Sequence, residues 1–323
     1  MDISVIIPIY NVERYIERCL VSLFTQTKTT GVEFILVNDA TPDDSMLVAE
    51  KLVSQFKNLS VLIINKSCNE GLALARQSGV DAASGDYIIH IDSDDWCEPT
   101  MLADLWTEVQ SSSPDIIVCD YYFNRRSGQE LICANMTNDN IECIYTMMQD
   151  ESKGAVWNKL FKRELYLQNG VRSTVRVNMW EDIYICSQLF YFAQKIVYLN
   201  KSFLHYMRDN AGCITSTPNI KQFHDMQCVV KELDQFFDAN DGVHKNILLS
   251  RKAYLKITLL GHFRGEEQRH YLSLYPEINN HIWHLDGFRL HKKIGLFLAG
   301  KNQQALFNMI NGIREFAIRC TNK

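Results

Sequence analysis

The sequence has few of the features that mark several large classes of protein. None of its 10 cysteines stands in a Cys-x-x-Cys pair, so neither a disulfide scaffold nor a thiolate zinc site is expected. No stretch approaches the ~20 apolar residues that a membrane-spanning helix requires. A net charge of −5 means that the chain has no basic surplus, which argues against a general nucleic-acid-binding protein.

Glycine-rich phosphate-binding loops are absent as well. The turn after the first predicted strand, Pro8–Glu13, contains no glycine, whereas a dinucleotide-binding fold and a P-loop both need glycines there. A bound nucleotide would therefore be held by side chains and a metal ion. The first residues also lack the basic region and the long apolar stretch of a secretory signal, so a reducing cytoplasm is the expected location.

The first third of the chain alternates compact β-branched runs with amphipathic segments. The runs predict strands over residues 4–9, 33–38, 61–65, 87–91 and 115–119. The segments between them predict helices over residues 14–27, 43–56, 72–83 and 100–112. This alternation is typical of βαβ units, and it predicts an α/β fold with a Rossmann-like, mostly parallel sheet flanked by helices.

The rest of the chain is less regular. Residues 124–140 are polar and predict a loop, which a helix over 180–193 and a strand over 196–199 follow. After Pro218 the pattern becomes helical, with helices expected over residues 223–238, 245–260 and 290–319. We therefore expect an α/β domain over residues 1–217 and a C-terminal helical region over residues 218–323.

Three carboxylates follow directly on a buried strand. Asp92, Asp94 and Asp95 come after the apolar run 87–91, and the ligands of an open α/β sheet collect outside the carboxyl ends of its strands. Mn²⁺ or Mg²⁺ is a natural partner, because hard cations take oxygen ligands and often bridge carboxylates to substrate phosphates. The alternative is a solvated turn in which Asp94 or Asp95 caps the following helix.

Four segments in this order resemble the inverting, bacterial-type family 2 glycosyltransferases, which have the GT-A fold. The segments span residues 5–11, 33–43, 69–79 and 91–95. Residues 156–161, 180–182 and 205–208 look like acceptor-side segments of the family, and the region after Pro218 resembles no part of it. The resemblance implies transfer of a sugar from a nucleotide-diphosphate sugar, with uridine the expected base, to an acceptor hydroxyl in cell-surface polysaccharide or glycoconjugate assembly.

By this resemblance residues 1–112 form the nucleotide-binding half of the domain and residues 113–217 the acceptor half. The implied nucleotide-binding residues are Pro8, Tyr10, Asn11, Glu13, Asp39, Asn69, Arg76, Asp92, Asp94 and Arg208. The implied metal ligands are Asp92, Asp94, Asp95 and His205. Asp39 would accept a hydrogen bond from the base, and Arg76 would neutralise the diphosphate. Their alternatives are a turn cap and an ordinary exposed helical arginine, and spacing does not decide which carboxylate is the main metal ligand.

An inverting transfer needs a base that removes the proton of the acceptor hydroxyl. The resemblance assigns this role to Asp182, with Glu181 binding the acceptor or adjusting the pKa of its neighbour. Both acids stand where a helix should begin, so their alternative role is to favour its N-terminus. Arg208, together with His205, would lie near the leaving diphosphate. Here the sequence departs from the family, because Cys213 stands where a serine is expected.

The C-terminal stretch 289–323 mixes basic and apolar residues and contains one acid, Glu315. It fits peripheral contact with the inner face of an anionic membrane, and it equally fits a packed helix with a solvated basic face. The expected partners are a nucleotide-sugar donor and a glycan or lipid-linked glycan acceptor, with no nucleic acid. Two other functions stay open: a nucleotidyltransferase, whose usual glycine-rich basic loop is missing here, and a non-catalytic nucleotide-sugar-binding assembly subunit.

Overall fold

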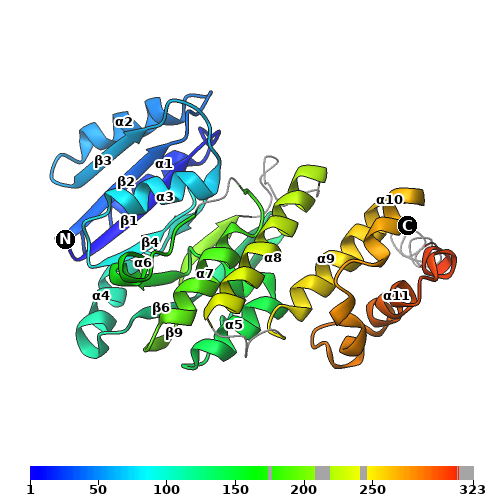
Figure 1. Ribbon diagram of the computed structural model, residues 1–323. Coiled ribbons are helices and arrows are strands. Elements are labelled where there is room, and N and C mark those ends of the chain that lie inside the picture. The colour runs from blue at the N-terminus through cyan, green and yellow to red at the C-terminus, as the bar shows by residue number, and fades with distance from the viewer. Residues whose placement is uncertain (174–176, 208–218, 241–245, 311, 313–323) are drawn as a thin grey trace. The chain divides into compact units, whose positions relative to one another are not determined.

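The structure, a computed structural model, describes residues 1–173, 177–207, 219–240, 246–310 and 312 (Figure 1). By its internal contacts the chain divides into two units, Met1–Met147 with Glu151–Pro218 and Met148–Asp150 with Asn219–Lys323. Over the described residues, no helix is both long enough and apolar enough to cross a membrane.

The first unit is built on a sheet of nine strands, counted over the described residues. Four of them pair in parallel in the order β3-β2-β1-β4: β1 (Ile3–Ile9), β2 (Val32–Asn38), β3 (Ser60–Asn65) and β4 (Tyr87–His90). Every residue of β1 and β4 is buried. Burial on both faces explains why these strands read as nearly unbroken apolar runs.

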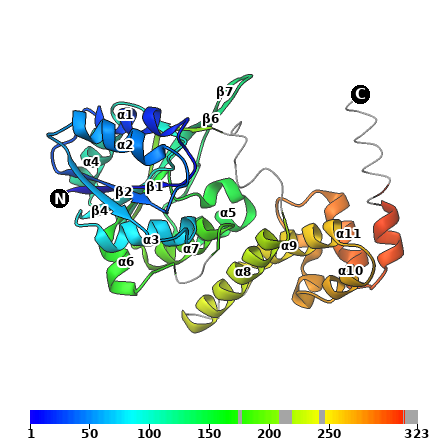
Figure 2. The same ribbon diagram turned by 90° about the horizontal axis from the view of Figure 1, so that it is seen from above.

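Helices cover both faces of this parallel part. α1 (Ile16–Phe24) and α2 (Ser45–Gln55) lie on one face, and α3 (Leu72–Ala82) lies on the other (Figure 2). α3 approaches β1 closely because Gly79 has no side chain: a Cβ there would come within 2.3 Å of Ile6 Cγ2. α4 (Met101–Ser112) packs Leu102 and Leu105 into the core that α1 also fills.

Beyond β4 the sheet is mixed. β8 (Lys159–Lys162) pairs antiparallel with β4 and with β6 (Ile116–Arg125), while β9 (Ile196–Met207) runs parallel to β6. β5 (Trp96–Cys97) pairs antiparallel with β9, and β7 (Gly128–Ile132) with β6. The same stretch of chain contains α5 (Asn140–Gln149), the 3-10 helix η1 (Glu151–Gly154), α6 (Arg163–Asn169) and α7 (Glu181–Phe192). The predicted α/β fold is confirmed, with a uniformly parallel sheet only in its first four strands.

Three predicted elements differ from the structure. The loop expected over 124–140 contains β7, whose residues are mostly exposed and so show no apolar alternation. The strand expected over 196–199 runs on to Met207, because its later residues pair with β6 across a register shift. The helix expected over 290–319 is interrupted: α11 ends at Gly300, Asn302 takes a left-handed φ of 58°, and helical residues resume at Gln304.

The second unit is helical, as predicted. Its elements are α8 (Ile220–Asn240), α9 (Leu249–His262), α10 (Gly265–Leu272), the 3-10 helices η3 (Pro276–Asn280) and η4 (Ile282–His284), and α11 (Leu290–Gly300). α9 lies against α8, α10, α11 and η3. Its side chains Leu249, Ala253 and Leu260 are buried in two small apolar clusters, so the unit has a core of its own.

Candidate active site

The carboxyl ends of the parallel strands bring the predicted donor-side residues to one edge of the sheet. Pro8 lies in β1 and Tyr10 just after it, whereas Asp39 follows β2 and Asp92 follows β4. Neighbouring parallel strands end at the same edge, and the Asp39 amide donates to the Ile9 carbonyl at 3.1 Å. Residues from separate segments therefore gather where an α/β sheet binds its ligands.

The turn after β1 is held by side chains instead of glycine-rich backbone. The Asn11 amide donates to Thr41 Oγ1 at 2.8 Å, and the Glu13 amide donates to Asp43 Oδ2 at 3.0 Å. Asn11 has a φ of 56°, a conformation that asparagine adopts more readily than most residues. Tyr10 stays 46% exposed at this edge of the sheet.

Asp39 is buried, and its carboxylate has backbone partners. Oδ1 accepts from the Glu70 amide at 3.0 Å, and Oδ2 accepts from the Gly71 amide at 2.8 Å. Lys66 Nζ lies 3.7 Å from Oδ1, and Asn69 Nδ2 donates to the Asp39 carbonyl at 3.4 Å. This carboxylate therefore holds the loop that leads into α3.

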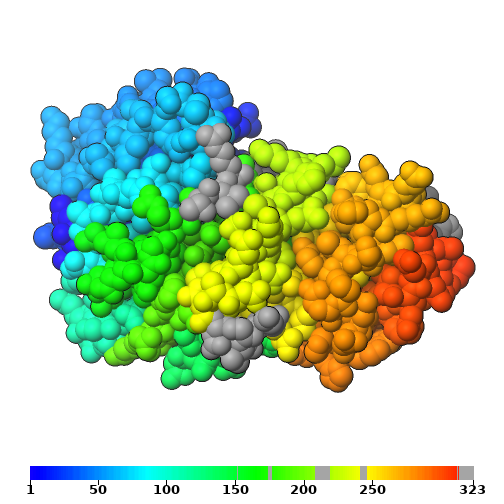
Figure 3. All heavy atoms as spheres, in the orientation of Figure 1, coloured from blue at the N-terminus to red at the C-terminus, as the bar shows by residue number. Residues whose placement is uncertain are grey.

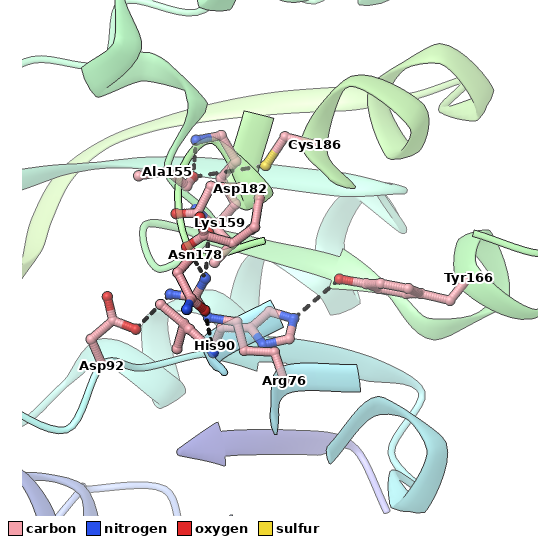
Figure 4. A network of polar contacts seen from close by, with 12 residues as sticks. Arg76, His90, Asp92, Ala155, Lys159, Tyr166, Asn178, Asp182 and Cys186 are labelled. Atoms are coloured by element: carbon pink, nitrogen blue, oxygen red, sulfur yellow. Dashed lines mark hydrogen bonds and ion pairs between the residues drawn. The ribbon is translucent and has the colours of Figure 1, made fainter. Parts of the chain in front are cut away.

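Arg76 on α3 contacts acids from two separate segments of the chain (Figure 4). Its Nη2 lies 2.6 Å from Oδ1 of Asp92, which follows β4. Its Nη1 lies 3.2 Å from Oε1 of Glu181, at the start of α7, and also donates to Asp182 Oδ1. The guanidinium is buried. The predicted diphosphate-binding arginine thus contacts the predicted base, its neighbour and a predicted metal ligand.

Three carboxylates around one guanidinium leave an excess of negative charge. Burial, and then the nearby Asp182, raises the pKa of Glu181 to about 8. Burial also raises the pKa of Asp182, although Arg76 opposes this shift. The Val156 amide donates to Asp182 Oδ2 at 3.2 Å, so both oxygens of this carboxylate are held. Burial therefore disfavours a negative charge on both acids at once, and Glu181 is the one whose pKa is raised to about 8.

Lys159 supports the segment that carries the Val156 amide. It is fully buried, and its Nζ donates to the carbonyls of Lys153 and Ala155 and to Asn158 Oδ1. Burial lowers the pKa of this lysine. Because all of these partners are neutral oxygens of residues 153–158, Lys159 orders that segment instead of reaching a substrate.

His90, the last residue of β4, is buried near Arg76 (Figure 4). Its Nε2 lies 3.2 Å from the Tyr166 hydroxyl. Burial, together with the charge of Arg76, lowers the pKa of His90 to about 3. The imidazole of His90 is therefore neutral, and it adds no charge beside the guanidinium of Arg76.

The predicted metal ligands Asp92, Asp94 and Asp95 follow β4. Asp95 is fully buried; its Oδ1 accepts from the Met207 amide at 2.9 Å, and Oδ2 has no hydrogen-bond partner in the described part of the chain. Burial, with the charges of Asp94 and Asp92, raises the pKa of Asp95. Among the described residues, no three His, Cys, Asp or Glu side chains form a complete metal-binding group. Mg²⁺ commonly takes one or two protein carboxylates and completes its shell with water and substrate phosphates.

His205, a predicted metal ligand, has partners of its own. Its Nε2 lies 2.9 Å from Glu98 Oε1, and its Nδ1 lies 3.4 Å from Asn124 Nδ2. The ring is stacked on Trp96 and on Tyr122, with centroid distances of 4.7 Å to each. Both nitrogens therefore face groups other than the three aspartates.

The other acceptor-side residues are placed as follows. The predicted Arg208 and the divergent Cys213 lie outside the described residues. Trp157 is buried in the main core, where its ring centroid lies 4.6 Å from that of Tyr121.

Two residues of the site carry no signal in the sequence. Arg18 on α1 donates to the Asp94 carbonyl at 3.0 Å, and its guanidinium lies 3.7 Å from the centroid of the Trp96 ring. Asn178 Oδ1 accepts from the Leu72 amide at 3.0 Å and so fixes the start of α3. In the sequence both look like ordinary surface residues, because the contacts that distinguish them are made across the fold.

Comparison with known proteins identifies relatives of the first unit. The family model described as glycosyl transferase family 2 matches residues 4–167. Glycosyltransferase GlyA of Streptococcus pneumoniae is 31% identical over 236 residues, which are 69% of this chain and 32% of that protein. The uncharacterized glycosyltransferase EpsJ of Bacillus subtilis is 31% identical over 224 residues, 67% of this chain and 63% of that protein. The chain therefore spans less than two thirds of the length of either relative.

Solved structures share the fold. Residues 1–349 of Staphylococcus aureus TarS, in complex with UDP-GlcNAc, align with a TM-score of 0.75 at 18% identity over 98% of this chain and 92% of that one. The mannosyltransferase PcManGT of Pyrobaculum calidifontis, in complex with GDP-Man and Mn²⁺, aligns with a TM-score of 0.50 at 14% identity over 97% and 86%. The GT-A fold class predicted from the sequence is confirmed.

Proposed function

This chain belongs to glycosyl transferase family 2, and on that premise we propose that it transfers a sugar from a nucleotide-diphosphate sugar to an acceptor hydroxyl, with inversion at the anomeric carbon. The contact that carries the proposal is that of Arg76 with Asp92 on the donor side and with Glu181 and Asp182 on the acceptor side. In a direct displacement the donor and the acceptor hydroxyl meet at one carbon atom, so the acids that position the donor and the acids that position the acceptor must lie close together. Residues 1–112 would bind the donor, residues 113–217 the acceptor, and residues 218–323 would form a separate helical region.

The donor is proposed to be a UDP-sugar. The residues that would bind it are Pro8, Tyr10, Asn11, Glu13, Asp39, Asn69, Arg76, Asp92, Asp94 and Arg208. Support comes from the exposed Tyr10 ring at the edge of the sheet and from the UDP-GlcNAc complex of TarS, which shares the fold. The acceptor would be a glycan or a lipid-linked glycan of a cell-surface polysaccharide, and the reaction would take place in the cytoplasm.

The cofactor is proposed to be Mn²⁺ or Mg²⁺. Asp92, Asp94 and Asp95 would hold it, and its charge would help to neutralise the leaving diphosphate. The unpartnered Oδ2 of the buried Asp95 supports this role, since a cation would satisfy it. The Mn²⁺ complex of PcManGT supports the choice of ion. His205 was also predicted as a ligand, and in that role it would first have to release Glu98.

Asp182 is proposed as the general base. Its carboxylate would take the proton of the acceptor hydroxyl while that oxygen forms a bond to the anomeric carbon and the bond from this carbon to the diphosphate oxygen breaks. The electron pair of the broken bond leaves with the diphosphate. Arg76 and the Val156 amide orient the base, and Glu181 would contact the acceptor.

A donor-hydrolysis screen tests this function. The purified chain is incubated with Mn²⁺ or Mg²⁺ and a panel of nucleotide sugars, and the released nucleoside diphosphate is measured. We expect slow, metal-dependent release from one donor, which Asp94→Asn abolishes. Asp86→Asn is the matched control, because this exposed aspartate precedes the same strand at its opposite end. Absence of release, together with no calorimetric binding of any nucleoside diphosphate, would overturn the donor site.

A further inference from the structure

The second unit exposes a cluster of large apolar side chains. Five of them lie between residues 283 and 309: Trp283, Leu290, Phe297, Leu306 and Met309. Trp283 is 52% exposed, Leu290 67% and Phe297 40%. The core of the unit does not need them, because α11 buries a different set of side chains, among them Leu296 and Leu298.

Three of these side chains share one face. Leu290 and Phe297 are seven residues apart on α11, which places them two helical turns apart on the same side. The ring of Trp283 adjoins that of Phe297, with centroids 5.9 Å apart. Leu290 and Phe297 therefore form an exposed apolar strip along α11, and Trp283 extends it beside Phe297.

Basic residues border the same strip. Lys293 Nζ donates to the Trp283 carbonyl at 2.9 Å, and Lys301 Nζ lies 6.0 Å from the centroid of the Phe297 ring. From Gly287 to Arg314 the sequence contains no Asp or Glu, although the whole chain has a net charge of −5. The positive charge is therefore local to this segment. We call the surface formed by Trp283, Leu290, Lys293, Phe297 and Lys301 the α11 face.

We propose that the α11 face docks on the surface of an anionic phospholipid bilayer. Tryptophan and phenylalanine rings settle at the boundary between headgroups and acyl chains, and lysines reach from there to anionic headgroups. α11 has 11 residues and is too short to span a bilayer, so the contact is peripheral. This inference does not rest on the proposed sugar transfer, and it is tested without substrate.

The charge of the α11 face favours lipid over a second copy of the chain. A two-fold dimer through this face would bring Lys293 and Lys301 of one protomer close to the same lysines of its partner. Such juxtaposition of like charges disfavours association. An anionic bilayer instead neutralises them, and each basic residue near its surface strengthens partition by roughly fivefold.

Vesicle flotation tests the proposal with the intact chain. The vesicles contain phosphatidylcholine alone or phosphatidylcholine with phosphatidylglycerol, each at low and high salt. One variant combines Trp283→Ser with Phe297→Ser. Another combines Lys301→Glu of the α11 face with Arg289→Glu, an exposed residue directly before Leu290. The control combines Leu131→Ser with Leu167→Ser, two leucines of the first unit that are 53% and 59% exposed. All substituted side chains are exposed, so thermal melting should stay close to that of the parent chain.

We expect flotation with phosphatidylglycerol vesicles only, weakened by salt and unchanged in the leucine control. Partition should fall by at least about tenfold in the charge variant, and it should also fall in the aromatic variant. If the aromatic variant melts early, the charge variant decides. Equal flotation of the charge variant and the parent chain would overturn the proposal. A dimer in lipid-free sedimentation that the aromatic variant dissociates would overturn it too, in favour of a second copy.

Discussion

Arg76 contacts Asp92, Glu181 and Asp182 from a buried position, so its charge and its shape can be tested separately. Arg76→Gln leaves these acids without their shared cation, and breaking a buried ion pair typically costs about 3–5 kcal/mol of unfolding free energy. Arg76→Lys keeps the charge and should cost less. Urea unfolding measures both variants. Arg172→Gln is the control, because its ion pair with Asp81 is exposed and should be worth less than about 1 kcal/mol.

The same arginine should set the pH dependence of the reaction. Burial raises the pKa of Asp182, and Arg76 opposes this shift. The proposed base is active when ionised, so kcat/KM should fall as the pH falls through the pKa of Asp182. In Arg76→Gln the opposing charge is gone, the pKa rises further, and the acid limb should move to higher pH. An acid limb at the same pH in Arg76→Gln, Arg76→Lys and the parent chain would contradict this role.

The two neighbouring acids of α7 should differ in their tolerance of amide substitution. Burial and Asp182 raise the pKa of Glu181 to about 8, so at pH 7 it carries a proton and glutamine resembles it. Glu181→Gln should therefore keep transfer within about tenfold, whereas Asp182→Asn removes the proposed base and should cost about 10²–10⁴-fold. Initial transfer rates at pH 7 measure both. Comparable losses of transfer rate in the two variants would refute the statement that Glu181 is protonated at pH 7.

At the residue scale, the sequence could nominate single residues but not the contacts between them. Asp92 was nominated from an acidic cluster after a strand and Asp182 from the resemblance, and the roles of both stay predictions. The contact of Arg76 with Asp182 could not be predicted, since it joins residues 106 positions apart. Arg18 was missed for the same reason, because only the fold brings it to Asp94.

At the scale of elements, the close packing of α3 on β1 depends on Gly79, which has no side chain. A Cβ at Gly79 would come within 2.3 Å of Ile6 Cγ2, and Ile6 is fully buried and cannot move aside. Gly79→Ala should therefore lower the free energy of unfolding by about 1–3 kcal/mol. Gly261→Ala on α9 is the matched control, because its Cβ would meet nothing within 4 Å. There alanine should be neutral or stabilise by up to about 1 kcal/mol, and equal losses at both sites would exclude the steric explanation.

The elements that could be predicted were those that bury apolar side chains in a regular pattern. β1 is buried along its whole length, and its apolar run is plain in the sequence. β7 escaped prediction because four of its five residues are exposed and its pairing with β6 rests on backbone hydrogen bonds. The second part of β9 was not predicted either. It pairs with β6 only after a shift in register, and no local sequence pattern indicates such a shift.

At the scale of the molecule, composition and the order of elements were enough to predict the fold class. The antiparallel strand β8 was not predicted, because it is short and has only Leu160 and Phe161 between two lysines. The chain divides after Pro218, where the hydrophobic pattern changes from compact runs to helical spacing. A sequence pattern identifies a helix by its apolar face, but it does not show what that face packs against. For this reason the sequence left undecided whether the apolar side chains of α11 have a partner.

The donor site should couple two ligands in the stability of the whole chain. Asp95 has an unpartnered buried oxygen, and its pKa is raised by burial and by the charges of Asp94 and Asp92. A cation bound alone would have too few ligands here. A diphosphate bound alone would be repelled by the negative charge of the aspartates. Mn²⁺ and UDP together should therefore raise the melting temperature far more than the sum of their separate effects. At a ligand concentration of 100 Kd the stabilisation is about 2.7 kcal/mol. Scanning calorimetry with each ligand, with both and with a chelator measures this, and Asp94→Asn should abolish the joint effect. Purely additive shifts would mean that metal and nucleotide do not share these carboxylates.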